Sequence, residues 1–124
     1  MMQLTYVTEL SAIVGEKLPY LKALLATSPD RLILRAKHLS EANYQSLALE
    51  LLPSSQAHGV RLIINHQVNV ARALNLPIQV SFHTSQEADL SGLIFGVSVH
   101  SYEEGEMARA KGASWLVYGH LFAT

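Results

Sequence analysis

The sequence contains no cysteine, which excludes a disulfide framework, a thiolate metal site and a cysteine nucleophile. It also lacks an excess of either charge, because nine Lys and Arg residues face ten Asp and Glu residues. A formal net charge of -1 gives no overall field that would recruit nucleic acid or an anionic membrane. No apolar run is long enough to span a bilayer, and the first residues do not resemble a signal peptide. We therefore expect a cytoplasmic protein with no nucleic-acid or membrane partner.

Several motifs of known chemistry are missing as well. The glycines form neither a Gly-x-Gly-x-x-Gly fingerprint nor a P-loop, and there is no Gly-x-Ser-x-Gly nucleophile elbow. The histidines do not have the His-Glu-x-x-His spacing or a comparable ligand spacing. The sequence therefore predicts no metal site.

Apolar residues make up 49% of the 124 positions, which suits one domain over residues 1–124 with a real core. Short β-rich runs recur along the chain, and most are apolar on both faces rather than alternating. This pattern is typical of parallel strands covered by helices. The predicted strands are Leu4–Thr8, Leu32–Arg35, Val60–Ile64, Ile78–Phe82, Leu93–Val99 and Trp115–Tyr118.

Helical patterns fill most of the gaps between these runs. The clearest begins at Ser40, a preferred cap residue, and carries one apolar stripe at helical spacing. Pro53 predicts a kink or an end in it, and Gly59 is its latest plausible stop. The other predicted helices are Leu18–Ala26, Val68–Leu74, one that begins at the capping-box sequence Ser101–Glu104 and ends at Gly112, and a single turn between Phe82 and Leu93.

A weak internal repeat supports a β-α-β unit. Arg31-Leu-Ile-Leu and Arg61-Leu-Ile-Ile open successive predicted strands thirty positions apart. Parallel strands joined by right-handed crossovers give either an open doubly wound sheet or part of a (β/α)8 barrel. The hydrophobic pattern alone does not choose between these two folds.

Polar residues gather where the predicted strands end, which is where both folds bind small molecules. They are Thr8, Glu9, Arg35, Lys37, Asn65, His66, His83, Thr84, Ser98, His100, His120 and Thr124. Arg35 and Lys37 are spaced i, i+2 on an extended segment, so both point to one side and suit a phosphate or carboxylate. Ordinary solvated charges are the alternative.

The other polar residues also have plainer interpretations. Asn65 is as well suited to capping the next helix as to a site, and His66 and His83 are typical surface or packing residues. His100 stands beside a helix start, where a local hydrogen bond would account for it. His120 follows an apolar strand and a glycine, so we expect it at the mouth of the site, where an imidazole is the usual proton carrier.

Four segments, in order and at suitable spacing, resemble the thiamine-phosphate synthase/TenI superfamily. Leu32–Ser40 is similar to its hydrophobic-x-Arg-x-Lys/Arg motif, and Leu62–Ala71 to its third strand with Asn and a following helix. Gly96–Ser101 is similar to its Gly-x-Ser-x-His-Ser/Thr motif, and Tyr118–Thr124 to its Gly-His/Pro-hydrophobic-Phe-x-Thr motif. The resemblance implies an incomplete TIM (β/α)8 barrel of about six parallel strands with helices.

Within this superfamily the sequence most resembles the thiazole tautomerases (TenI family). Tautomerases have histidine where synthases usually have proline, and His120 stands at that position. Synthases bind magnesium through two acidic positions, of which the first holds His66 here and the second, near Ser81–Ser85, has no acid. The loss of these acids speaks against synthase activity, although a synthase homologue remains the alternative.

The resemblance implies a proton-transfer enzyme that aromatises a thiazole carboxylate phosphate and needs no cofactor. By this likeness His120 is the acid/base, Arg35 and Lys37 face the anionic ligand, and Asn65, Ser98, His100 and Thr124 shape the pocket.

The sequence ends at Thr124, before the last two strands and the phosphate site of the superfamily, so the barrel is expected to be truncated. Two chains are then expected to associate as a homo-oligomer that covers the open sheet edges, and a folded monomer in light scattering would contradict this. A non-catalytic binding or assembly module is a further alternative.

Overall fold

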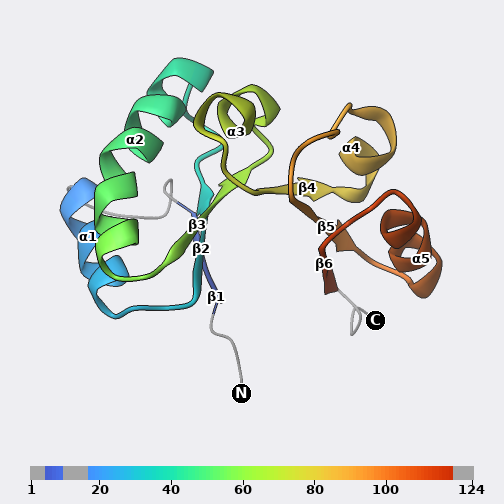
Figure 1. Cartoon of the computed structure of the whole chain (residues 1–124), viewed down its shortest axis with the longest axis horizontal. Helices are drawn as coiled ribbons and strands as arrows, with labels where there is room; N and C mark the ends of the chain where they lie inside the picture. Colours follow the sequence, from blue (N-terminus) through green and yellow to red (C-terminus); the bar gives the residue numbers. More distant parts are fainter. Residues whose placement is uncertain (1–4, 10–16, 119–124) are drawn as a thin grey trace.

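Six parallel strands form one sheet in which neighbours in space are neighbours in sequence. The computed structural model of the protein describes residues 5–9 and 17–118 (Figure 1). The strands are β1 (Thr5–Glu9), β2 (Arg31–Arg35), β3 (Arg61–Asn65), β4 (Ile78–Ser81), β5 (Phe95–Val99) and β6 (Trp115–Tyr118). The helices are α1 (Lys17–Ala26), α2 (Glu41–Ala57), α3 (Val68–Leu74), α4 (Phe82–Glu87) and α5 (Tyr102–Ala110).

The sheet curls, and the labelled helices all lie on its outer, convex side (Figure 1). A doubly wound sheet would carry helices on both faces, so that alternative is wrong and the expected partial (β/α)8 barrel is confirmed. The repeated segments pair directly, with Arg31 opposite Arg61 and Leu32 opposite Leu62 in the β2–β3 register. That residues 1–124 form one domain stays a prediction.

Side chains alternate between the two faces of each strand, and the outward ones form the core. They pack beneath the helices and are almost completely buried, which makes this layer the main source of hydrophobic stabilisation. The outward residues of this core are Leu32, Leu34, Leu62, Ile64, Ile78, Val80, Phe95, Val97 and Val99. The inward positions are therefore left to face the hollow of the half-barrel.

Helix α2 runs from Glu41 to Ala57 through Pro53, so a helix end at Pro53 is wrong, while a kink there stays a prediction. The proline removes the hydrogen bond that would reach the carbonyl of Leu49, a residue on the exposed side of the helix. The inner side stays anchored on both sides of Pro53 through the buried residues Leu51 and Ser55. Tertiary packing thus outweighs the local cost of the proline. The helix ends before Gly59, as predicted.

Ser101 caps the helix as predicted, but the second bond of the capping box comes from the N–H of His100 and not from that of Ser101. The Ser101 hydroxyl accepts a hydrogen bond from the Glu104 N–H at 3.1 Å, and the Glu104 carboxylate accepts one from the His100 N–H at 2.8 Å. The helix α5 therefore starts at a fixed point directly after β5. Among the described residues no helix has the length and apolar character needed to cross a membrane.

Apolar side chains are exposed near both ends of the sheet. Val7 on β1 is 56% exposed, and Val117 and Tyr118 on β6 are 43% and 44% exposed. Among the described strands, β1 pairs only with β2 and β6 pairs only with β5. Self-association over these edges stays a prediction.

Tyr44 connects α2 to two strands at their carboxyl ends. The side chain is 1% exposed. Its hydroxyl donates to the carbonyl of Leu34 at 2.5 Å and accepts from the N–H of Asn65 at 2.9 Å. Burial raises the pKa of the Tyr44 hydroxyl, so it stays neutral and keeps the hydrogen that it donates. One side chain thereby fixes where β2 and β3 end.

We expect Tyr44→Phe to lower the free energy of unfolding by about 1–3 kcal/mol, because it leaves a buried carbonyl and a backbone N–H without their partner. Urea unfolding followed by circular dichroism measures this. The matched control is Tyr102→Phe, since Tyr102 is 72% exposed and should change stability by no more than about 0.5 kcal/mol. Equal effects of the two substitutions would contradict the bridging role.

Candidate ligand-binding site

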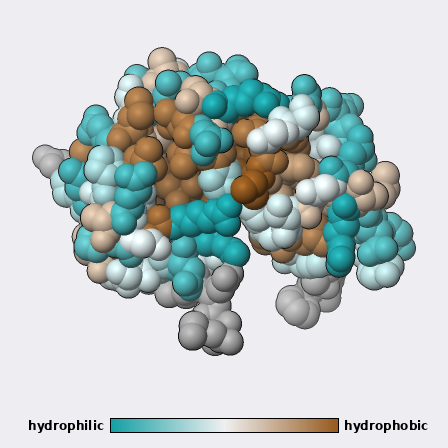
Figure 2. Space-filling model, in the orientation of Figure 1, coloured by the Kyte–Doolittle hydropathy of each residue, from teal (hydrophilic) through white to brown (hydrophobic). Residues whose placement is uncertain are grey.

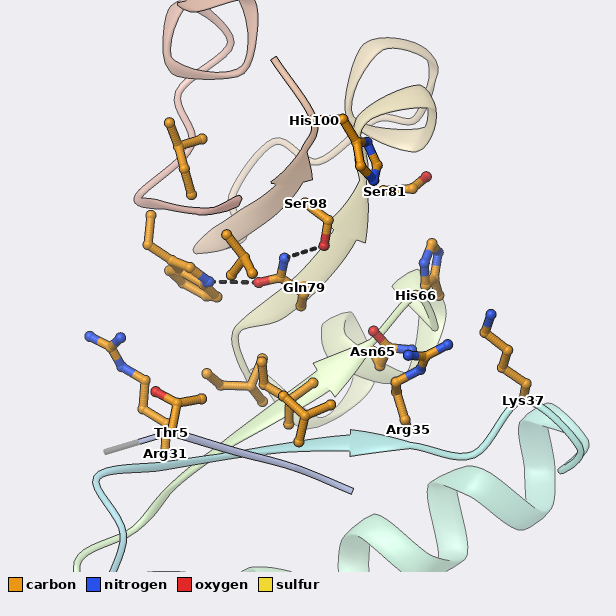
Figure 3. Close-up of a pocket in the computed structure, with 16 residues that line it drawn as sticks. Thr5, Arg31, Arg35, Lys37, Asn65, His66, Gln79, Ser81, Ser98 and His100 are labelled. Carbon is orange, nitrogen blue, oxygen red and sulfur yellow. Dashed lines mark hydrogen bonds between the residues drawn. The ribbon is translucent and has the colours of Figure 1, made fainter. Parts of the chain in front are cut away.

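The inward side chains line a cavity of about 740 Å³ on the concave face of the sheet. In the space-filling view the molecule is hollowed between its two halves, and both hydrophilic and apolar side chains reach the hollow (Figure 2). The lining residues come from every strand: Thr5, Val7, Arg31, Ile33, Arg35, Lys37, Ile63, Asn65, His66, Gln79, Ser81, Ser98, His100, Trp115, Leu116 and Val117 (Figure 3). The cavity is thus the ligand site that a curled parallel sheet offers.

Positive charge gathers at one corner of the cavity. Arg35 ends β2 and Lys37 follows two residues later, so both side chains reach the same side of the sheet, as predicted (Figure 3). Asn65, from the neighbouring strand β3, and His66 lie beside them (Figure 3). The corner offers two permanent cations and an amide, a set that suits an anionic oxygen group.

The capping role considered for Asn65 is wrong. The residue before α3 is Gln67, and no side chain makes the cap hydrogen bond there. The Asn65 side chain lines the cavity instead, while its backbone N–H is held by the Tyr44 hydroxyl.

His66 is also part of this corner, although the sequence favoured a surface or packing residue. Its φ angle is 64°, so the chain turns through the left-handed region directly after β3. Its backbone N–H donates to the carbonyl of Gln79 at 2.9 Å, which holds the turn against β4. Partial burial, followed by the charges of Lys37 and Arg35, lowers the pKa of His66 below its ordinary 6.5. The imidazole is therefore neutral at pH 7.

Uncharged polar side chains from β4, β5 and β6 form the opposite wall, and the Arg31 guanidinium of β2 lies 5.9 Å from the centroid of the Trp115 ring. Trp115 Nε1 donates to Gln79 Oε1 at 2.6 Å, and Gln79 Nε2 donates to Ser98 Oγ at 2.9 Å. Ser81 lies in register with Ser98, yet its hydroxyl caps α4: it accepts from the Thr84 N–H at 3.2 Å and donates to Thr84 Oγ1 at 3.0 Å. Of these two hydroxyls, Ser98 is the one available to a ligand.

The remaining predicted residues lie in different places. His100 lines the cavity, and its Nδ1 is 3.5 Å from Glu104 Oε1, so it does have the local partner that the sequence suggested. His83 is not among the lining residues of the cavity. It is exposed, and its Nε2 atom lies 2.9 Å from Glu87 Oε2 on α4. His120 and Thr124 fall outside the described residues. The roles assigned to all of these residues stay predictions.

The lining residues do not fit a magnesium site. None of the described ones is Asp or Glu, whereas Mg²⁺ is held by carboxylate, phosphate and water oxygens. Nor do the described parts of the chain bring together three or more His, Asp or Glu side chains able to hold a metal ion. Instead, Arg35 and Lys37 supply positive charge directly.

Sequence reasoning missed Gln79 and Trp115, which form the polar wall. The sequence did carry a signal for Gln79, because this polar residue stands between the apolar residues Ile78 and Val80 of a predicted strand. In the structure Gln79 is just 4% exposed. A buried amide needs hydrogen-bond partners. These partners come from strands β5 and β6, at positions that the local sequence does not reveal.

Comparison with known proteins places these features in a family. The family model described as thiamine monophosphate synthase matches residues 4–124. A thiamine-phosphate synthase of Roseiflexus castenholzii is 33% identical over 111 residues, covering 82% of this chain and 47% of the relative. One of Clostridium acetobutylicum is 32% identical over 100 residues, covering 73% of this chain and 46% of the relative. The chain therefore spans about half the length of these curated relatives.

A solved structure shows the same fold. The thiamine phosphate pyrophosphorylase from Pyrococcus furiosus superposes with a TM-score of 0.77 at 22% sequence identity. The match covers 94% of this chain and 59% of that protein. At this identity the likeness concerns the fold alone, and it agrees with the half-barrel described above.

The lowered pKa of His66 predicts a pH dependence of stability. Because its pKa is lower in the folded state, the unfolded state binds more protons as the pH falls below 6.5. The free energy of unfolding should therefore decrease on acidification until the pH passes the folded-state pKa. We expect wild type to lose more stability between about pH 7.5 and pH 5 than His66→Asn, which has no imidazole to protonate.

Asparagine is the matched substitution because it tolerates a positive φ. Urea unfolding of both proteins at a series of pH values measures the difference. Parallel pH profiles for wild type and variant would contradict a lowered pKa at His66.

Proposed function

The chain belongs to the thiamine monophosphate synthase family, and we propose that its cavity binds a phosphorylated thiazole of thiamine biosynthesis. The observation that carries this proposal is the pair of cations, Arg35 and Lys37, beside a cavity with no carboxylate among its described lining residues. A phosphate ester is the anion that thiamine biosynthesis supplies to such a corner.

The chemistry of the corner supports a phosphate ligand. A guanidinium presents several N–H groups in a fixed fork that matches phosphate oxygens, and a lysine adds a mobile point charge. Ile33 and Ile63 are buried inward-facing residues of the same cavity. A ligand with a charged end and a flat, partly apolar ring is the kind that these surfaces complement.

The first candidate activity is that of a thiamine-phosphate synthase homologue, as the names of the matched relatives suggest. Those relatives are about twice as long as the matched part of this chain. The resemblance gives such synthases a magnesium ion for pyrophosphate charge, a group that the described lining residues do not fit. In this chain, Arg35 and Lys37 would have to neutralise the phosphate charge themselves.

The second candidate activity is thiazole tautomerisation. Two residues favour it: the neutral His66 stands where the resemblance places a synthase acid, and His120 stands where tautomerases have histidine. Moving a proton within a thiazole carboxylate phosphate needs an acid/base and an anion site, and no metal. His120 would transfer the proton while Arg35 and Lys37 hold the phosphate.

Binding tests the shared part of both candidates. We expect thiazole phosphate to bind with a Kd in the micromolar range, and Lys37→Gln to weaken it about tenfold, because an ion pair to the phosphate is lost. Isothermal titration calorimetry measures this. The matched control is Lys22→Gln on α1, an exposed lysine outside the cavity lining, which should leave the Kd unchanged.

If Lys37→Gln and Lys22→Gln weakened the binding of thiazole phosphate equally, the loss would come from the lower net charge alone. That result would contradict a specific phosphate-binding corner. The unphosphorylated thiazole alcohol serves as the ligand control and should bind far more weakly than thiazole phosphate.

Turnover distinguishes the two activities. Under the tautomerase reading the chain converts the thiazole carboxylate phosphate to its aromatic isomer, and His120→Ala lowers that rate by about 10²-fold or more because the proton carrier is gone. Ultraviolet absorbance follows the reaction. Formation of thiamine phosphate in a parallel assay would instead support the synthase homologue. Binding of thiazole phosphate without either reaction would support the third alternative, a non-catalytic binding module.

A further inference from the structure

Three side chains form a hydrogen-bonded row across the wall of the cavity opposite Arg35 and Lys37. They come from adjacent strands: Trp115 from β6, Ser98 from β5 and Gln79 from β4 (Figure 3). The two bonds are 2.6 Å from Trp115 Nε1 to Gln79 Oε1 and 2.9 Å from Gln79 Nε2 to Ser98 Oγ. The amide in the middle is 4% exposed, so water has little access to replace either bond.

The row has a direction that chemistry fixes. An indole N–H can only donate, so Gln79 must turn its carbonyl oxygen towards Trp115. Its NH₂ group then faces Ser98, whose oxygen accepts. A serine hydroxyl has one hydrogen of its own, and within the described residues no acceptor takes the hydrogen of Ser98. Because Ser98 lines the cavity, that hydrogen is left for an acceptor inside it.

Gly96 makes the row possible. In the sheet register Gln79 lies opposite Gly96, and Gly96 lies opposite Trp115. A Cβ atom at Gly96 would lie 1.9 Å from the Trp115 ring, so only glycine lets the indole cross β5 and reach Gln79. The Arg31 guanidinium lies 5.9 Å from the ring centroid on the other side of the half-barrel. The ring is thus held from β2 as well as from β4.

We propose that Trp115 and Gln79 are positioning residues that hold the Ser98 hydroxyl as a hydrogen-bond donor into the cavity. The ligand class that this wall complements has an acceptor oxygen there, such as a carboxylate or phosphate oxygen, which takes the hydrogen of the Ser98 hydroxyl. The inference rests on the proposed function for the identity of the ligand, although the direction of the row does not depend on it.

The decisive substitution is Gln79→Glu, which keeps the shape but can reverse the row. An ionised carboxylate still accepts from Trp115 but also accepts from Ser98, so the serine hydrogen turns away from the ligand. The added negative charge by itself also weakens an anionic ligand. The same substitution in a Ser98→Ala background measures that charge effect alone, because no hydroxyl remains to be turned.

The experiment is a double-mutant cycle of Kd values for thiazole phosphate, measured by calorimetry at about pH 8.5 on wild type, Gln79→Glu, Ser98→Ala and the double variant. We expect Gln79→Glu to weaken binding about tenfold more in the wild-type background than in Ser98→Ala, as the loss of a hydrogen bond to a charged group predicts. Lowering the pH should protonate the glutamate, restore a donor towards Ser98 and recover part of the affinity. Equal effects in the two backgrounds would overturn the proposal.

A second readout is independent of the ligand. Trp115 is the only tryptophan in the chain, so its indole N–H gives one nuclear magnetic resonance signal. We expect that signal to stay shifted and protected from exchange in Gln79→Glu and to lose both properties in Gln79→Met. An unprotected signal in wild type would overturn the row. A protected signal in a wild type that does not bind thiazole phosphate would support the row and reject the proposed function instead.

Discussion

The alternation of side chains along parallel strands is the constraint on which this molecule depends. Once helices cover the outer face of the sheet, every second residue of each strand joins the core and the rest must face the hollow. The core takes Leu32 and Leu34 from β2, while Arg31, Ile33 and Arg35 of the same strand face inward. The alternation of side chains along β2 is therefore enough to place Arg35, the cation at its end, in the cavity, and no special loop is needed.

Much of this could be predicted from sequence because the information is local. The strand runs are apolar, the helices carry caps and stripes, and the repeated Arg-Leu-Ile segments pair side by side in the β2–β3 register. The spacing of Arg35 and Lys37 placed both at the cavity for the same reason. The resemblance to known motifs then chose the barrel, a choice that periodicity could not make because both candidate folds share the same strands and helices.

The parts that could not be predicted depend on partners far apart in the chain. Gln79 and Trp115 are 36 positions apart and meet only because Gly96, between them in the register, has no side chain. His66 reads as a surface residue until the turn after β3 puts it beside Lys37 and Arg35. Pro53 reads as a helix breaker, yet buried neighbours on the inner side of α2 carry the helix through it.

The two faces of the sheet divide the work of folding and of binding. The buried outward layer supplies the hydrophobic stabilisation, so polar residues on the inner face can be arranged for a ligand at modest cost to the fold. Tyr44 is an exception to this division between a folding face and a binding face, because it contacts both. It belongs to the outer core, but its hydroxyl holds the N–H of Asn65, the residue with which β3 reaches the cationic corner. A change in the core at this position is transmitted to the cavity through one hydrogen bond, whereas the Trp115–Gln79–Ser98 row lines the cavity and none of its residues belongs to the outer core.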